Sequence, residues 1–194
     1  ATGGEYIDLG IAADDEDSLR ALTQNARGAD MLITLGGASV GDHDLVRKVL
    51  GKDGLELNFW RIAMRPGKPL IFGKIGKTPM MGMPGNPVSS LVCGLIYLRP
   101  AIRAMLGLNP QGTTQTAILG EDLRGNDERQ DYLRATTAIN SNGECVVSPF
   151  EKQDSSMLFN FTRADCLIVR APNEKPTQAG AIVEVIPLDG EKMG

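Results

Sequence analysis

The pattern of apolar residues changes at Asn109–Pro110, and this change constrains the fold more than any other feature of the chain. Before it, apolar runs such as DMLITLGG (30–37) alternate with segments of helical periodicity such as DLVRKVLGKDG (44–54). After it, short strand-like runs separated by turn residues follow one another. We therefore expect an α/β domain over residues 1–109 and a small β-barrel domain over residues 110–194.

Strands alternate with helices in the first domain, and the early strands are almost entirely apolar. Such strands are typical of a sheet that helices cover on both faces, which makes the expected fold a three-layer α/β/α sandwich. Pro100 is expected to kink the last helix. Strands are expected over residues 5–11, 30–37, 55–64, 69–75 and 78–83, and helices over 15–28, 44–54 and 87–107.

Charge is distributed unevenly in this chain of net charge −4. Residues 1–109 contain 12 basic and 11 acidic residues, whereas residues 110–194 contain 8 and 13. No Asp or Glu occurs from Leu57 to Gly120, although seven Lys and Arg residues do. A local surplus of positive charge in an acidic protein favours a small anionic ligand in a focused site, and the acidic balance argues against a nucleic-acid partner.

Several other classes of protein are disfavoured by composition. No run approaches 18 consecutive apolar residues, and no basic-then-apolar signal segment stands at the start, so we expect a cytoplasmic protein without a membrane partner. The three cysteines are widely spaced and fit buried or free thiols in a reducing compartment. A single histidine, His43, excludes a multi-histidine metal site, and no serine-hydrolase, zinc-protease or Walker A motif is present.

The segment MGMPGNPVSS (81–90) links a predicted strand to a predicted helix. Pro84 and Gly85 favour a rigid turn that lets a ligand approach the backbone closely. Asn86 is a strong helix N-cap, and Pro87 suits the first helical turn. With Ser89 and the free backbone N–H groups, the loop is a candidate anion site; an ordinary helix start is the alternative.

A second glycine-rich loop, GGASVGDHD (36–44), follows a buried strand. Its glycines let backbone approach a ligand, and Ser39 offers a hydroxyl. Asp44 stands where α/β sheets bind ligands and could hold Mg²⁺, although it could equally cap the next helix. The candidate ligand-binding residues of this loop are Gly36, Gly37, Ser39 and Gly41.

A third loop, MRPGKPL (64–70), carries two cations between prolines. Because prolines restrict the unfolded chain, Arg65 and Lys68 would be held with little ordering cost. Arg can make a forked contact to an oxyanion and Lys a point contact. Solvated charges on a turn are the alternative.

Taken in order, LITLGGASVGDHDLV, RIAMRPGKPLIFGK and MGMPGNPVSSLV resemble the molybdopterin molybdenumtransferase family, which includes bacterial MoeA and the C-terminal part of gephyrin. The later EDLRGNDERQDYLRATT and QDSSMLFNFTRADCLIVRAP resemble that family's C-terminal β-barrel domain. The resemblance implies a MogA-like molybdopterin-binding sandwich, from which the first strand and helix of the family pattern are missing, followed by the barrel.

The resemblance also implies an activity in molybdenum cofactor biosynthesis. In this transferase reaction molybdate is inserted into adenylylated molybdopterin with Mg²⁺, and AMP is released. Asp14 and Asp44 match acidic positions linked to catalysis and metal binding. The matched substrate-binding positions are Pro84 and Pro87 near the insertion site, Arg65 and Lys68 in the PGKP loop, and Arg134 and Ser155 in the last domain.

Partners follow from the same resemblance: a homodimer in the full-length protein, and a possible molybdopterin adenylyltransferase partner. This chain would be the C-terminal ligand-binding portion, weakly active or inactive by itself. A non-catalytic molybdopterin-binding, dimerisation or scaffold module is the alternative function. A molybdopterin adenylyltransferase is the third reading, and the barrel-like tail and the RPGKP sequence argue against it.

Overall fold

The computed structural model describes residues 3–13, 15–37, 45–112, 114–154 and 157–188, and it divides into two compact units. The first unit comprises Ala1–Ile62 and Gly67–Pro110, and the second comprises Ala63–Pro66 and Gln111–Gly194. The sequence analysis included residues 63–66 in the first domain, residues 1–109. The structure instead assigns them to the second unit, because strand β3 (Met64–Arg65) pairs in parallel with strand β7 (Gln130–Ile139).

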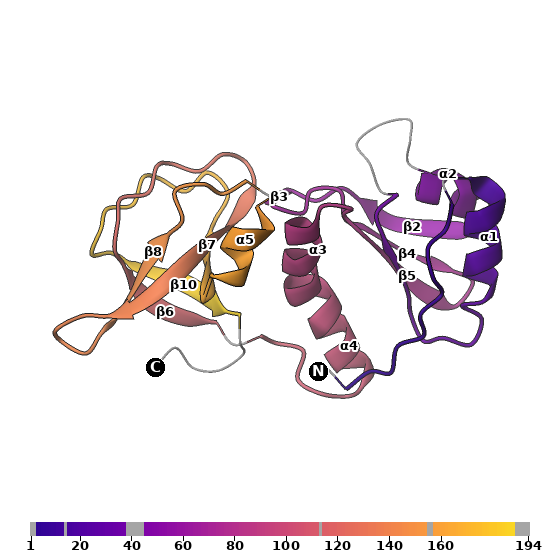
Figure 1. The fold of residues 1–194 in the computed structure, drawn as a ribbon, viewed down its shortest axis with the longest axis horizontal. Coiled ribbons are helices and arrows are strands. Elements are labelled where there is room, and N and C mark those ends of the chain that lie inside the picture. The colour runs from indigo at the N-terminus through magenta and orange to yellow at the C-terminus, as the bar shows by residue number, and fades with distance from the viewer. Residues whose placement is uncertain (1–2, 14, 38–44, 113, 155–156, 189–194) are drawn as a thin grey trace. The chain divides into compact units, whose positions relative to one another are not determined.

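The first unit is built on a four-stranded sheet (Figure 1). Its order is β1 (Leu32–Leu35), β5 (Thr78–Met83), β4 (Ile71–Ile75) and β2 (Leu55–Trp60). Only β1 and β5 are parallel; β4 is antiparallel to both of its neighbours. The sheet is therefore mixed.

Helices cover both faces of this sheet, which confirms the predicted three-layer sandwich (Figure 1). On one face, α1 (Glu16–Gln24) and α2 (Leu45–Lys52) supply Leu19 and Val49 to a core that includes Met80 of β5. On the other, the side chain of Met83 approaches Gly94 in the long helical run. Because successive strand residues point to opposite faces, β5 serves both layers.

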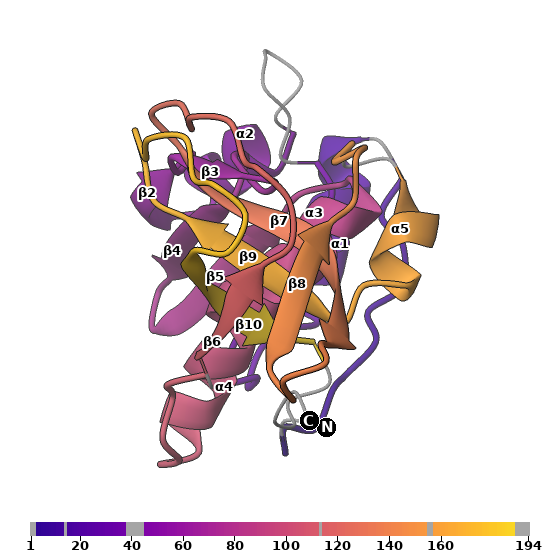
Figure 2. The same ribbon diagram turned by 90° about the vertical axis from the view of Figure 1, so that its left-hand side faces the viewer.

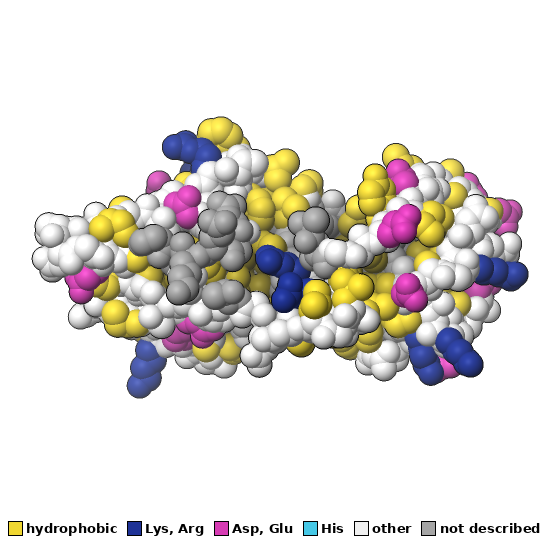
Figure 3. Space-filling model, turned by 90° about the horizontal axis from the view of Figure 1, so that it is seen from below, with side chains coloured by type: hydrophobic (Ala, Val, Ile, Leu, Met, Phe, Trp, Pro, Cys, Tyr) yellow, Lys and Arg dark blue, Asp and Glu magenta, His cyan; other side chains and the backbone are white. Residues whose placement is uncertain are grey.

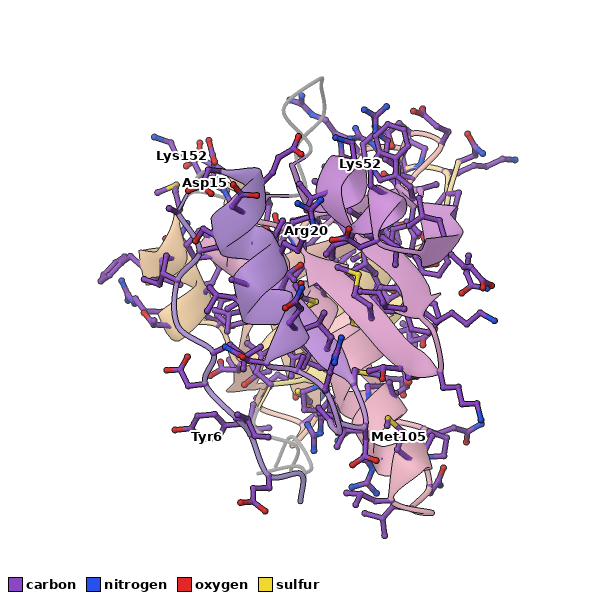
Figure 4. All side chains as sticks on the ribbon, turned by 90° about the vertical axis from the view of Figure 1, so that its right-hand side faces the viewer. Tyr6, Asp15, Arg20, Lys52, Met105 and Lys152 are labelled. Atoms are coloured by element: carbon purple, nitrogen blue, oxygen red, sulfur yellow. The ribbon has the colours of Figure 1, made fainter. Side chains whose placement is uncertain are left out.

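The first turns of α1 and its contact with α2 follow local sequence signals. Asp15 caps α1 by accepting a hydrogen bond from the Ser18 backbone N–H at 2.7 Å. Arg20 Nε reaches Asp53 Oδ2, just beyond α2, at 2.8 Å. Figure 4 shows Asp15 at the start of α1 and Arg20 on the side that faces α2. The helix ends at Gln24, four residues before Gly28, where the sequence had predicted its end.

The long helical run consists of α3 (Pro87–Cys93), a π-helical turn (Gly94–Leu98) and α4 (Arg99–Met105). Pro100 has no N–H to donate, and the Arg99 N–H bonds to the Gly94 carbonyl in the π pattern. The expected irregularity at Pro100 is therefore a π-helical turn. Among the described residues this run alone is long and apolar enough to cross a membrane by length and composition. Val88 and Val92 in its first turns are fully buried.

One predicted strand of the first unit does not form. Residues 5–11 adopt neither helix nor strand, and Tyr6, Ile7 and Ile11 are exposed. An apolar alternation becomes a strand only when a neighbouring strand is present. Leu9 packs against the core of the first unit, but residues 5–11 pair with no strand in the described part of the chain. Tyr6 projects from the N-terminal segment in Figure 4, and Figure 3 shows hydrophobic side chains gathered over the region of α4.

The second unit is a closed five-stranded β-barrel, as predicted (Figure 2). The strands run in the closed order β7, β8 (Cys145–Pro149), β6 (Gln115–Leu119), β10 (Ile182–Pro187), β9 (Cys166–Arg170) and back to β7, with β3 added outside β7. Helix α5 (Leu158–Thr162) precedes β9. Alternate residues of the strands fill the interior; the core residues are Ala117, Leu119, Ala135, Val147, Cys166, Ile168, Val183 and Val185.

Candidate functional site

The loop that follows β5 forms the helix start that the sequence predicted. Asn86 Oδ1 accepts a hydrogen bond from the Ser89 backbone N–H at 3.4 Å, and Pro87 occupies the first helical turn. The Ser90 hydroxyl donates a short hydrogen bond to the Pro84 carbonyl and ties the loop to the helix. Ser89 is only 5% exposed, so it offers little surface to a ligand, whereas Gly85 is exposed.

The loops after β1 and β5 touch one another through two glycines. Gly36 donates its N–H to the Met83 carbonyl at 3.1 Å and has a φ of +81°. A Cβ on Gly85 would lie 3.3 Å from Gly36 Cα. Both loops leave the carboxyl ends of the parallel strand pair, which is the edge where α/β sheets bind ligands. The structure therefore brings Gly36, Gly85 and Asn86 into one region of the first unit.

Lys68 lies in a loop that the first unit holds by backbone contacts. Its carbonyl accepts from the Ile62 N–H at 3.0 Å, and the Cys93 thiol donates to the Gly67 carbonyl at 3.8 Å. Burial raises the pKa of Cys93 to about 12, so this thiol stays protonated. The Lys68 side chain is exposed and can reach an anion.

Arg65, which the sequence treated as a free cation beside Lys68, is engaged inside the second unit. Its guanidinium makes a short ion pair with Asp131 and donates to Asp127 at 3.1 Å. The hydrogen bond from the Arg129 side chain is the main cause that holds the pKa of Asp127 at about 2. The backbone N–H of Arg129 and the charge of Arg65 also lower this pKa, by smaller amounts. The positive charge of Arg65 is thus largely neutralised by two carboxylates.

Arg134 is the strongest ligand-binding candidate among the described residues of the barrel. Its side chain is 0% exposed, and Nη2 donates to the Asp154 carbonyl at 3.2 Å. Nε and Nη1 have no hydrogen-bond partner within the described part of the chain. Burial lowers the pKa of Arg134 from its usual value, although the Asp154 charge opposes this effect. A buried guanidinium with two free donors is costly unless an acceptor, most favourably an anion, completes it.

Gln153 fixes the chain beside Arg134 and was missed by sequence reasoning. Its Oε1 accepts from the Arg134 backbone N–H at 3.0 Å, and its Nε2 donates to the Arg134 carbonyl at 2.9 Å. Nε2 also donates to the Phe150 carbonyl at 2.8 Å. The only sequence signal for a role of Gln153 is its position two residues before Ser155. Its neighbours in sequence do not indicate that it bonds to Arg134, nineteen residues away.

Five of the predicted site residues lie outside the described residues: Asp14, Ser39, Gly41, Asp44 and Ser155. Across the ranges that are described, no three His, Cys, Asp or Glu side chains come together as a metal site.

Both units match known families. Residues 1–104 match the family described as "Probable molybdopterin binding domain", and residues 116–188 match "MoeA C-terminal region (domain IV)". The chain thus joins an α/β domain of this first family to a barrel of the MoeA C-terminal family. The chain belongs to the MoeA-type molybdopterin molybdenumtransferase family, as the sequence motifs had indicated.

Individual relatives agree with this assignment. The chain is 35% identical over 188 residues to the molybdopterin molybdenumtransferase of Haemophilus influenzae, covering 95% of this chain and 46% of that protein. It is 36% identical over 196 residues to the Nostoc protein of the same name, covering 96% and 44%. A Pyrococcus horikoshii MoeA crystal structure matches with a TM-score of 0.77 and 29% identity over 96% of this chain and 44% of that one. The chain thus spans a little under half the length of these relatives.

Proposed function

We propose that the chain is the C-terminal ligand-binding portion of a molybdopterin molybdenumtransferase. In this proposal molybdate is inserted into adenylylated molybdopterin and AMP is released. The observation that carries it within the chain is Arg134, a buried guanidinium with two unpaired donors in a family whose reaction uses an oxyanion. A guanidinium with unpaired donors suits a tetrahedral oxyanion such as molybdate.

The first unit would hold the organic part of the substrate. The outward backbone near Gly36, Gly37, Gly85 and Asn86 allows close approach of an anionic group, with Pro84, Pro87 and Ser89 shaping the loop. Lys68 offers an exposed point charge for a phosphate. Ser39, Gly41 and Ser155 complete the proposed substrate-binding set.

Asp14 and Asp44 are proposed as the catalytic carboxylates and Mg²⁺ ligands. The protein is proposed to be a cytoplasmic homodimer that receives its substrate from a molybdopterin adenylyltransferase.

The test is molybdate-dependent AMP release by the polypeptide that carries this chain in its natural sequence context. Arg134→Gln should lower turnover at limiting molybdate at least tenfold, because two charge-assisted donors are lost. Arg134→Lys keeps the positive charge but not the planar guanidinium, so it should recover only part of the lost turnover. Normal molybdate dependence in Arg134→Gln would remove Arg134 from the site. Binding of molybdopterin with no turnover in the parent protein would favour the non-catalytic alternative.

A further inference from the structure

A pocket with charged and apolar lining residues lies in the barrel unit, and no family assignment explains it. Its volume is about 210 Å³, several times the roughly 30 Å³ that one water occupies in the liquid. Arg65, Arg124 and Arg170 line it together with one carboxylate, Asp131. The lining therefore carries more positive than negative charge, which favours an anion.

Two of these arginines are already paired. Arg65 is bound by Asp131 and Asp127, and Arg170 Nε donates to Glu174 at 2.7 Å. Arg170, which is 2% exposed, also donates to two backbone carbonyls. Arg124 has no ion pair or side-chain hydrogen bond among the described residues and is exposed. Arg124 is therefore the cation that remains available to a ligand.

Asp131 requires a ligand that carries a hydrogen-bond donor, which a fully ionised anion lacks. The residue is 5% exposed, Oδ2 is bound by Arg65, and Oδ1 has no hydrogen-bond partner in the described part of the chain. A buried carboxylate oxygen without a donor is unfavourable and selects a ligand that carries one. A fully ionised oxyanion would instead place oxygen against oxygen.

We propose that this pocket binds a protonated oxyanion of the phosphate class, whose hydroxyl donates to Asp131 while its charged oxygens accept from Arg124. Hydrogen phosphate has both groups at neutral pH. Sulfate and molybdate carry no proton there and are rejected. The pocket is thus separate in specificity from the molybdate site proposed at Arg134, and it does not depend on the proposed activity.

The test is titration calorimetry on the 194-residue chain at neutral pH and fixed ionic strength, with inorganic phosphate, methyl phosphate, sulfate and molybdate. Because Arg134 also binds oxyanions under the proposed function, each titration is repeated in Arg134→Met. In that background phosphate should bind at one site, about tenfold or more tighter than sulfate or molybdate. Methyl phosphate, a monoester with a second pKa of about 6, is mostly doubly charged at neutral pH and lacks the hydroxyl that donates to Asp131, so it should bind more weakly than phosphate. Equal affinity for the two would contradict the role of Asp131.

Arg124→Gln should weaken phosphate binding about tenfold. The matched control Arg163→Gln removes the same charge from the same unit, outside the pocket, and should leave the affinity unchanged. Asp131→Asn replaces the acceptor by an amide that can donate, so sulfate should then bind at least as well as phosphate. Equal affinity for phosphate and sulfate in the parent, no phosphate binding, or equal losses in Arg124→Gln and Arg163→Gln would each overturn the proposal.

Discussion

Gly36 and Gly85 meet where strands β1 and β5 end, so closely that a Cβ on Gly85 would stand 3.3 Å from Gly36 Cα. Their two loops come from segments about fifty residues apart, and both are rich in glycine or proline. The contact makes one continuous backbone surface at the carboxyl edge of the parallel pair. Gly36 holds a φ of +81°, which other residues rarely adopt, and Gly85 leaves little room for a side chain, so this surface depends on both glycines.

Gly37→Ala should destabilise the first unit by about 1–3 kcal/mol. Gly37 has a φ of +69°, and an added Cβ would lie 2.6 Å from Val46 Cγ2. Gly51 is the matched control, because it lies within α2 and its Cβ would meet nothing within 4 Å. Gly51→Ala should be stabilising by about 0.5–1 kcal/mol. Urea denaturation of both variants measures the difference, and equal effects would contradict the strain argument.

Asn86→Ala should cost about 1 kcal/mol of stability, because the Ser89 N–H loses its capping acceptor. Asn86→Asp keeps an acceptor and adds a favourable charge at the helix start, so it should retain the parent's stability. The same denaturation experiment compares the two. A loss in Asn86→Asp as large as in Asn86→Ala would show that the amide does something other than cap the helix.

Arg134→Met should leave the free energy of unfolding, measured without ligand, within about 1 kcal/mol of the parent or above it. The buried guanidinium has two unpaired donors, so an apolar side chain of similar length removes an unfavourable desolvation. Molybdate affinity should fall in the same variant. A large loss of stability would mean that Arg134 stabilises the folded barrel. Its burial would then be explained without a role in ligand binding.

Acid stability should depend on Asp127. Its carboxyl has a pKa of about 2 in the folded protein, mainly because Arg129 donates to it, against an ordinary value of 3.8. A lowered folded pKa contributes stability that is present above about pH 4 and is lost as the pH falls towards 2. Asp127→Asn should therefore flatten the pH dependence of stability between about pH 4 and pH 2. Parallel acid-denaturation curves for parent and variant would contradict this assignment.

The thiols should differ in reactivity. Burial raises the pKa values of Cys93 and Cys166 to about 12, and both side chains are inaccessible. Cys145 is only partly buried, although burial raises its pKa as well. Iodoacetamide at pH 8 should modify Cys145 first in the native protein, and Cys93 and Cys166 only on unfolding. Peptide mass mapping identifies the modified thiol; early modification of Cys93 would show that its helix opens.

Local signals in the sequence determined the elements whose causes lie within a few residues. The N-cap at Asn86, the proline in the first turn of α3 and the irregularity at Pro100 are set by side chains next to the backbone groups they affect. The change of pattern at Pro110 likewise separated the sandwich from the barrel, because strand and helix periods differ along any short stretch.

Only the tertiary structure decided which distant segments pair. Residues 5–11 have a strand-like pattern but no neighbouring strand, and residues 63–66 leave the sandwich because β7 offers them an edge. Arg65 reads as a free cation until Asp131, sixty-six residues away, is brought beside it. Pairing over such separations depends on the folded chain as a whole, and therefore burial and charge at these sites cannot be deduced from adjacent residues.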